Sequence, residues 1–379
     1  MIKSDSKFPG KKVMVELGAR SYPIYVGSES LCGFGELFLG HCRGQGSGDK
    51  GQSPGRAVII TDENVGPLYG EAVRENMSQC GVETHIITVE AGEKSKCRAK
   101  VELIYEKLFD YSIERADAIV ALGGGVVGDL AGFAGATFKR GVNYVQFPTS
   151  LLAMVDSSIG GKTGINHTRG KNMIGSFYQP KMVWADTATL KTLPKRELGC
   201  GLAETVKHAV IRDKEFFEHL ETNAGAIMQL DTESMVDLVV RNCRIKAGVV
   251  AADEQESNLR GILNLGHTIG HTIETVLAER DIHHGEAVAL GMVGAARLAG
   301  KRGLLKKEEE ERIAALLETF KLPTQAGSPL PADELYRAMK QDKKVRAGKI
   351  RFVLPTSIGS CTFVDDLSEE EIKEVILTL

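Results

Sequence analysis

Short runs of β-branched and aliphatic residues alternate, along the first half of the chain, with segments whose apolar residues recur at helical spacing. The runs predict strands at residues 13–17, 22–26, 57–61, 85–89, 118–122 and 142–147, the first two of them paired. The segments between them predict helices at residues 69–80 and 95–111. Such an alternation indicates a mostly parallel sheet with helices on both faces.

After Pro194 the apolar spacing becomes helical almost throughout. It predicts helices at residues 196–208, 214–220, 233–252, 268–278, 286–301 and 306–320, with a strand signal only at 350–354. A chain of 379 residues is long enough for two domains. We therefore expect an α/β, Rossmann-like domain at residues 1–185 and an all-α domain at residues 186–379. The polar, Gly-rich stretch 41–55 is predicted to be a mobile surface loop, and no function is assigned to it.

Composition narrows the class of protein. Hydrophobic residues make up 42%, charged residues 26%, and the net charge is −3, so the chain lacks the basic footprint of a nucleic-acid or anionic-membrane binder. No apolar run approaches the roughly 20 residues of a membrane span, and the first residues lack the apolar core of a signal peptide. The 7 scattered cysteines fit reduced thiols. We expect a cytoplasmic protein with a small-molecule partner, and neither a nucleic acid nor a membrane as partner.

A glycine motif follows the predicted strand at 118–122. Residues 123–128 satisfy G-x-G-x-x-G, and a helix is predicted at 130–138. In that context glycines let backbone N–H groups approach a pyrophosphate, whose charge the helix N-terminus favours. No acidic residue closes a strand about 20 residues later, as an ordinary dinucleotide fold requires. The motif alone leaves a nucleotide site and a simple tight turn as alternatives.

A second glycine-rich segment, Gly160-Gly161-Lys162-Thr163, ends like a P-loop. The first glycine of that motif would fall on Asp156, so the P-loop interpretation fails. What remains is a polar loop that carries Asp156, Lys162, Lys171 and Asn172. These side chains suit an anionic, hydroxylated ligand, and a merely solvated loop is the alternative.

Histidines concentrate in the second half of the chain. His267 and His271 are four residues apart, which places both imidazoles on one helix face, and spacing alone predicts both as metal ligands. Further donors stand at His283 and His284 and on the predicted helix that carries Glu204 and His208. A divalent metal site is the hypothesis, and hydrogen-bonded core histidines are the alternative.

Basic residues supply the last pattern. Each of them alone is most simply a surface charge, but together with a metal and a nucleotide they predict a substrate that carries carboxylate and phosphate groups. They are Arg140, Lys207, Lys246, Arg260, Lys343 and Lys344.

These segments, in this order, closely resemble the 3-dehydroquinate synthase family of the sugar phosphate cyclases. The resemblance extends from about residue 56 to 360 and is carried by long motifs: GGGVVGDLAGF (123–133), RGVNYVQFPTSLLAMVDSSIGGKTGIN (140–166), GLAETVKHAVI (201–211), LRGILNLGHTIGH (259–271), HGEAVALGM (284–292) and DKKVRAGKIRFVLPTSIG (342–359). Motifs of such length are far more specific than the lone glycine fingerprint.

The resemblance implies an NAD-binding α/β domain followed by an α-helical metal domain, in a cytoplasmic homodimer. The implied reaction, in the shikimate pathway of aromatic amino acid biosynthesis, converts 3-deoxy-D-arabino-heptulosonate 7-phosphate to 3-dehydroquinate and phosphate. It would proceed by transient oxidation with NAD, β-elimination of phosphate, re-reduction, ring opening and aldol closure, with Zn²⁺ or Co²⁺ as the metal. Such an enzyme is a carbon–oxygen lyase.

The resemblance also assigns residues. The implied metal ligands are Glu204, His267 and His284, which moves His271 from the ligands to the substrate and proton-transfer residues. The implied catalytic residues are Lys162, Asn172, Lys207, Glu256 and His271. The implied substrate contacts are Arg140 (from the partner subunit), Asp156, Lys162, Asn172, Lys207, Lys246, Arg260, Asn264, His271 and Lys343 or Lys344. The implied NAD contacts are Asp62, Asn64, Glu93, Lys96, Gly124, Gly125, Val126, Val127, Gly128, Asp129, Thr149, Ser150, Lys162, Lys171, Thr189, Leu190, Lys191 and Thr192.

Three other functions compete with this one. Another sugar phosphate cyclase would use the same cofactors on a different sugar, but a neutral sugar would leave Arg260 without an anionic partner. A metal-dependent polyol dehydrogenase would show net NADH production. A non-catalytic nucleotide-binding regulator would turn over no sugar phosphate, and it leaves the metal-ligand set unexplained.

Overall fold

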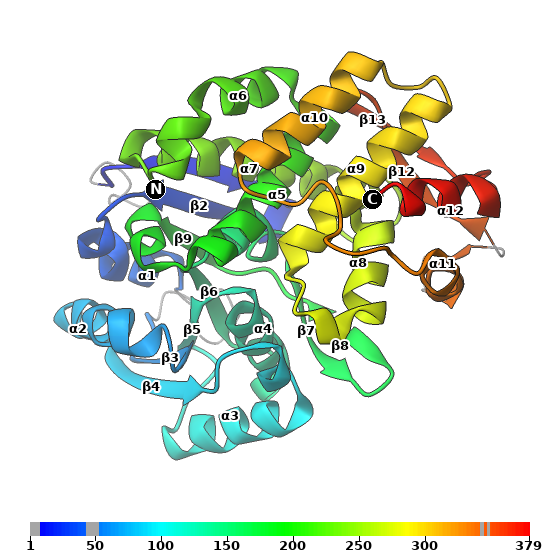
Figure 1. Ribbon diagram of the computed structural model, residues 1–379. Coiled ribbons are helices and arrows are strands. Elements are labelled where there is room, and N and C mark those ends of the chain that lie inside the picture. Colours follow the sequence, from blue (N-terminus) through cyan, green and yellow to red (C-terminus); the bar gives the residue numbers. More distant parts are fainter. Residues whose placement is uncertain (1–7, 43–52, 342–344, 347–348) are drawn as a thin grey trace. The chain divides into compact units, whose positions relative to one another are not determined.

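A seven-stranded sheet forms the core of the N-terminal unit (Figure 1). The computed structural model describes residues 8–42, 53–341, 345–346 and 349–379, and in this part of the chain the strands lie in the order β1-β2-β9-β6-β5-β3-β4. They are β1 (Lys11–Val15), β2 (Tyr22–Gly27), β3 (Arg56–Asp62), β4 (Glu83–Val89), β5 (Ala118–Gly123), β6 (Asn143–Pro148) and β9 (Met182–Asp186). β1 and β2 pair antiparallel, and all other neighbours pair parallel. The predicted fold class is confirmed, although β9 was not among the predicted strands.

Both faces of this sheet are covered by helices, as alternation along β3 shows. Val58 and Ile60 pack with apolar residues of α3 (Arg98–Asp110) and α4 (Gly125–Thr137). Ala57 and Ile59 point the other way, toward α1 (Phe34–His41) and α2 (Glu71–Gln79). Because successive side chains of a strand face opposite sides, a continuous apolar run in β3 satisfies both layers.

The segment around Lys162, predicted to be a polar loop, is instead a β-hairpin of β7 (Lys162–His167) and β8 (Gly170–Phe177). Gly164 and Gly175 pair directly across it. A Cβ at either position would lie 2.6 or 2.2 Å from a backbone oxygen of the opposite strand. These glycines allow two backbones to approach closely, so their abundance here does not indicate a loop.

The chain divides into two compact units, Met1–Leu193 with Met235–Ala251, and Pro194–Ser234 with Ala252–Leu379. Most of α7 (Thr232–Ala252) therefore groups with the α/β unit, although it stands in the middle of the helical sequence. The division falls eight residues after the expected boundary at 185/186, beyond the short 3-10 segment Thr187–Thr192. Of the stretch 41–55, residues 43–52 lie outside the described residues.

The second unit is helical. Its helices are α5 (Lys195–Arg212), α6 (Lys214–Met228), α8 (His267–Val276), α9 (His284–Lys301), α10 (Lys307–Thr319), α11 (Ala332–Gln341) and α12 (Glu369–Leu377). α9 is apolar on nearly every side and packs against α5, α8, α10 and α12, so it is the central helix of the unit. The expectation of an all-α domain needs one correction, because two short hairpins are present: β10 (Val345–Arg346) with β11 (Lys349–Ile350), and β12 (Phe352–Ser357) with β13 (Ser360–Val364).

None of the helices in the described ranges combines the length and the apolar character needed to span a bilayer.

Candidate functional site

Most of the predicted NAD contacts follow the carboxyl ends of the strands, at one edge of the parallel sheet. Parallel strands place their carboxyl ends along the same edge, and ligands of such sheets bind there, where the strand order reverses. β3 has β4 on one side and β5 on the other, so the reversal lies between the ends of β3 and β5. The segments that follow the strand ends carry Asp62 and Asn64 after β3, Glu93 and Lys96 after β4, Gly124 to Asp129 after β5, Thr149 and Ser150 after β6, and Thr189 to Thr192 after β9.

The glycine motif links β5 directly to α4. Gly124 is the extended residue before the helix, and α4 begins at Gly125, earlier than the predicted start at residue 130. A Cβ on Gly125 would lie 3.0 Å from Ser157 Oγ, a tight contact that glycine avoids at the helix N-terminus. The first N–H groups of a helix lack intrahelical acceptors and attract phosphate. The structure therefore fits a pyrophosphate at this turn.

Asp62 is the last residue of β3, and one of its two carboxylate oxygens is hydrogen-bonded within the loop that follows. Its Oδ1 accepts the N–H groups of Asn64 and Val65, both at 2.9 Å. Among the described residues no hydrogen bond to Oδ2 is found, so this oxygen remains to accept from a hydroxyl group. An acidic side chain at a strand end is the usual partner of a ribose hydroxyl.

A polar network joins the segment after β4 to the glycine motif. The Lys96 ammonium lies 2.5 Å from Asp129 Oδ2, and both side chains are largely buried. Burial raises the pKa of Asp129, and the charge of Lys96 opposes that rise. Asn166 on β7 donates to Glu93 Oε1 at 2.7 Å and accepts the N–H of Asn172 at 2.8 Å. The network thus reaches the β7–β8 hairpin, where Lys162, Lys171 and Asn172 are exposed.

The remaining predicted substrate residues of this unit fall into one pair and one isolated side chain. Lys246 Nζ on α7 lies 2.6 Å from both the backbone oxygen and Oδ1 of Asp156, and the lysine side chain is only 6% exposed. Arg140 is exposed and stands in the left-handed region at φ 65°.

The three predicted metal ligands meet in the helical unit. Glu204 on α5, His267 at the start of α8 and His284 at the start of α9 each offer one ligand atom, all within 4.8 Å of one another. Glu204 Oε1 lies 3.5 Å from His267 Nε2 and 3.4 Å from His284 Nε2. A carboxylate and two imidazoles are a ligand set suited to zinc with an open position.

Close backbone packing explains why these helices bring their first turns together. A Cβ on Gly291 of α9 would lie 1.9 Å from the backbone oxygen of Gly266, the residue before α8. A Cβ on Gly285 would lie 2.3 Å from Cα of Cys200 on α5. Glycine at both positions allows α9 to approach α8 and α5 at van der Waals distance of their backbones. The ligands therefore converge because of residues that are not ligands themselves.

The cluster is electrostatically suited to a cation. Glu204 is completely buried and forms an ion pair with Lys207, one helical turn further along α5. Burial alone would raise the pKa of Glu204, but Lys207 and His267 hold it well below its ordinary value. Burial lowers the pKa of His284, yet the carboxylates of Glu204 and Glu274 outweigh it and raise that pKa to about 10. Glu204 Oε1 has no hydrogen-bond partner of good geometry among the described residues. A buried carboxylate oxygen in that position fits a metal ion.

His271 belongs to a second group that shares His284. His271, Glu274 and His284 also offer ligand atoms within 4.8 Å, and the His267 and His271 ring centroids are 4.9 Å apart. The group around Glu204 is the more deeply buried of the two. Glu274 Oε2 lies 3.2 Å from His284 Nδ1, on the opposite side of the ring from Glu204. That contact orients the imidazole so that Nε2 faces Glu204, which is the usual arrangement around a metal-binding histidine.

The connection between α7 and α8 carries the other predicted residues of this unit. Arg260 is buried at 2% exposure, and its Nη1 donates to the backbone oxygen of Glu254 at 2.5 Å. The backbone N–H of Arg260 donates to Asp253 Oδ2 at 3.0 Å. Asn264 Nδ2 donates to Glu256 Oε1 at 3.2 Å, and Glu256 stands at φ 58°. This segment holds a buried guanidinium and a carboxylate–amide pair in fixed positions.

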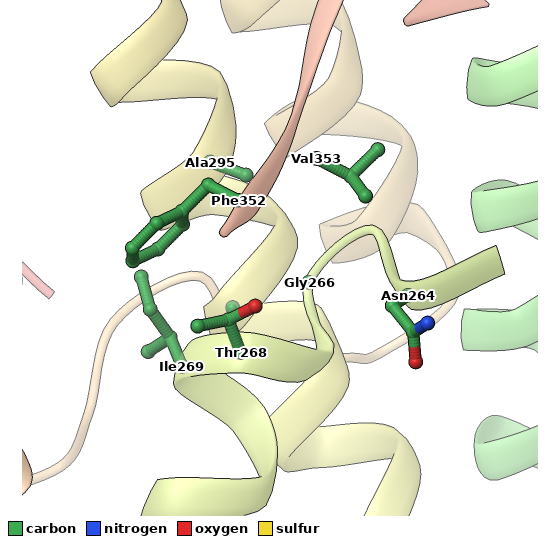
Figure 2. A pocket seen from close by; sticks show the side chains of 8 residues that line it. Asn264, Gly266, Thr268, Ile269, Ala295, Phe352 and Val353 are labelled. Carbon is green, nitrogen blue, oxygen red and sulfur yellow. The ribbon is translucent and has the colours of Figure 1, made fainter. Parts of the chain in front are cut away.

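A small gap between packed elements lies beside Asn264 (Figure 2). The side chains of Thr268 and Ile269 from α8 line it together with Phe352 and Val353 from β12. The gap leaves essentially no room for a water molecule, so it does not hold a sugar phosphate.

Two predicted site residues lie outside the described part of the chain, and three residues that contact predicted site residues were not predicted. Lys343 and Lys344 are outside the described residues. Tyr69, Asn166 and Glu274 were not predicted, yet each contacts predicted site residues. Tyr69 Oη lies 2.6 Å from Thr192 Oγ1. Glu274 stands three residues after His271 on the same helix, and this spacing could have predicted that it faces the histidine cluster.

Comparisons with known proteins agree with this arrangement. Residues 86–200 match the family model described as 3-dehydroquinate synthase N-terminal, and residues 201–345 match 3-dehydroquinate synthase C-terminal. A curated relative, 3-dehydroquinate synthase from Desulforamulus reducens, is 45% identical over 96% of this chain and 99% of its own.

Two solved structures share the fold. 2-epi-5-epi-valiolone synthase from Streptomyces hygroscopicus subsp. jinggangensis, with NAD⁺ and Zn²⁺ bound, aligns with a TM-score of 0.83 at 28% identity, over 96% of this chain and 97% of that one. 2-deoxy-scyllo-inosose synthase, in complex with carbaglucose-6-phosphate, NAD⁺ and Co²⁺, also gives 0.83, at 27% identity over 97% and 100% of the two chains.

The fold and the clustered ligands thus define a two-unit enzyme of the sugar phosphate cyclase type. Within that class, the chain belongs to the 3-dehydroquinate synthase family. The family and the class of enzyme predicted from the sequence are confirmed.

Proposed function

We propose that this chain converts 3-deoxy-D-arabino-heptulosonate 7-phosphate to 3-dehydroquinate and phosphate, with NAD that is used and regenerated within each turnover. The observation that carries the proposal is the convergence of Glu204, His267 and His284 in a chain that matches this family over nearly its whole length. The relatives of known structure bind NAD⁺ with Zn²⁺ or Co²⁺. We propose Zn²⁺ as the metal here, with Co²⁺ as a competent substitute.

The cofactors supply two kinds of chemistry when bound: NAD accepts and returns a hydride, and the metal polarises a substrate hydroxyl. Glu204, His267 and His284 would hold the metal. The carboxyl edge of the sheet would hold NAD, with its pyrophosphate at the N-terminus of α4 and a ribose at Asp62. In this proposal Lys96 and Asp129 act as a buried ion pair that fixes the floor of the nucleotide site.

The chain's own residues have separate tasks at the substrate. Arg260 would bind the substrate carboxylate, since its planar fork matches a carboxylate bidentately. His271 and Glu256 would move protons, and the position of Glu256 is set by its contact with Asn264. Lys162, Lys207, Lys246 and Asn172 would hold the phosphate as it departs, because a leaving dianion needs cationic and amide donors. Asp156 would keep Lys246 in place.

We further propose a cytoplasmic homodimer in which Arg140 of each subunit completes the other's site. Arg140 is exposed on the surface of its own unit. Exposed apolar side chains on β8, Met173, Ile174 and Phe177, support an interface with a second copy.

Substrate identity is tested by offering the heptulosonate phosphate and glucose 6-phosphate, which lacks a carboxylate, to the same preparation with NAD⁺ and Zn²⁺. We expect turnover of the first only. Arg260→Lys, which keeps the charge and loses the fork, should raise KM for the heptulosonate about tenfold. Arg280→Lys, at an exposed arginine of the same unit, is the control and should leave KM unchanged. Preference for the carboxylate-free sugar would favour another cyclase activity instead.

A further inference from the structure

A second cluster of metal-ligating side chains lies in the helical unit, apart from the ligands described above. Glu197 and Cys200 on α5 and His283, the residue before α9, each offer one ligand atom, all within 4.8 Å of one another. His283 Nδ1 lies 2.9 Å from Glu197 Oε1. None of these three residues belongs to the proposed NAD, substrate or metal contacts.

Local sequence explains the convergence. Glu197 and Cys200 are three residues apart and share one face of α5. The absence of a side chain at Gly285 brings the first turn of α9 onto the backbone of Cys200, and His283 precedes that turn directly. The loop before α9 is thus held over the face of α5 that carries the thiol.

Arg196, the residue before Glu197 on α5, holds this loop in place. Its Nε and Nη2 donate to the two carboxylate oxygens of Glu286, at 2.6 and 2.8 Å, and its Nη1 donates to Asp281 Oδ2 at 2.7 Å. Planar, bidentate contacts of this kind fix geometry as well as charge. The ligand atoms are therefore preorganised by contacts that do not involve the ligands themselves.

The donor set has the chemistry of a transition-metal site. A thiolate, an imidazole and a carboxylate together favour zinc over calcium or magnesium, and three protein ligands leave a fourth position for water. We propose that Glu197, Cys200 and His283 bind a second divalent cation of the zinc type, independently of the catalytic metal and of the proposed reaction.

Cys200 is suited to this role and not to that of a reactive thiol. Its side chain is buried, and burial raises the pKa of the thiol to about 12, so that the group is neutral in the absence of a metal. A metal would displace the thiol proton and would also replace the hydrogen shared between His283 and Glu197. The bound ion would cross-link α5 to the start of α9, and so raise the thermal stability of the chain by an amount that grows with the logarithm of the free metal concentration above the dissociation constant.

Cobalt distinguishes the two sites, because a thiolate bound to Co²⁺ gives a charge-transfer absorption in the near ultraviolet and a site of carboxylate and imidazoles does not. Co²⁺ alone is titrated into the metal-free full chain, and bound metal is counted by elemental analysis. We expect two ions per chain, with thiolate absorption that saturates at one of them. Cys200→Ser should bind one ion fewer and lose the absorption. Cys361→Ser, at another cysteine of the same unit, should retain both.

His283→Gln repeats the test at a partly exposed position, so that a folding defect at buried Cys200 does not decide the result. Glu204→Ala should lose one ion and keep the thiolate absorption, which separates this proposal from the assignment of the catalytic ligands. A single ion per chain in the wild type, a second ion without thiolate absorption, or an absorption that persists in Cys200→Ser would each overturn the proposal.

Discussion

Glu204 shows how one buried residue sets the demands of a whole site. Its carboxylate is removed from water and is faced by two imidazoles and the Lys207 ammonium. The charge state of each of these groups therefore affects that of the others. Leaving one partner of such a group unmatched costs several kcal/mol, because the remaining charge stays buried. In the proposed function a metal would take the central position, and the residues around it would then serve to orient the ligands.

Glu274 is the residue that orients His284, and its contribution is measurable. Glu274→Gln removes the anionic acceptor at His284 Nδ1, so we expect metal affinity to fall about 10- to 100-fold while the fold is kept. The dissociation constant is measured by competition with a chelator. Glu279→Gln, the same substitution at an exposed glutamate of the same unit, is the control. Unchanged affinity in Glu274→Gln would contradict an orienting role.

At the scale of elements, the spacing of apolar residues was a sound guide to what each segment is. All six predicted strands of the N-terminal unit and most predicted helices are present, since each buries a regular apolar stripe. One error occurred where glycine serves close packing. The segment of the β7–β8 hairpin was predicted to be a polar, glycine-rich loop, whereas the pairing across the hairpin requires glycine at Gly164 and Gly175.

Gly291 tests this account of close packing between α8 and α9. Gly291→Ala places a methyl group 1.9 Å from the backbone oxygen of Gly266, so the helices must separate, and we expect a loss of about 1–3 kcal/mol in the free energy of unfolding. Gly225→Ala on α6 meets nothing within 4 Å and should stabilise the chain by about 0.5–1 kcal/mol through helix propensity. Urea denaturation of both variants measures the difference. Equal stabilities would show that the backbone contact does not matter.

At the scale of the whole molecule, sequence patterns located the site only in part. Histidine spacing placed His267 and His271 on one helix face, and Glu204 was only one of several further candidate donors, because it lies far away in the sequence and approaches through α5. Likewise, no local signal joins Asp62 to the glycine motif, because their proximity depends on the strand order. The family resemblance supplied these groupings, because its long motifs include residues that are far apart in the sequence and close together in the fold.

The proposed exchange of Arg140 between subunits is tested by mixing two inactive variants. An Arg140→Ala chain keeps its own Lys162, and a Lys162→Ala chain can donate an intact Arg140, so a mixed dimer regains one complete site. After dissociation and reassociation of equal amounts, we expect about a quarter of the wild-type activity to return. Neither variant alone should recover on the same treatment. No recovery in the mixture, with mixed dimers demonstrated by differential tags, would place Arg140 in its own subunit's site or outside any site.

The central claim is a reaction in which NAD is required and yet not consumed. The most direct measurement is phosphate release from 3-deoxy-D-arabino-heptulosonate 7-phosphate by the purified chain with NAD⁺ and Zn²⁺, with the NADH absorbance followed in the same cuvette. The account predicts phosphate and 3-dehydroquinate in equal amounts and no net NADH. Steady accumulation of NADH, or no phosphate from this substrate, would contradict it.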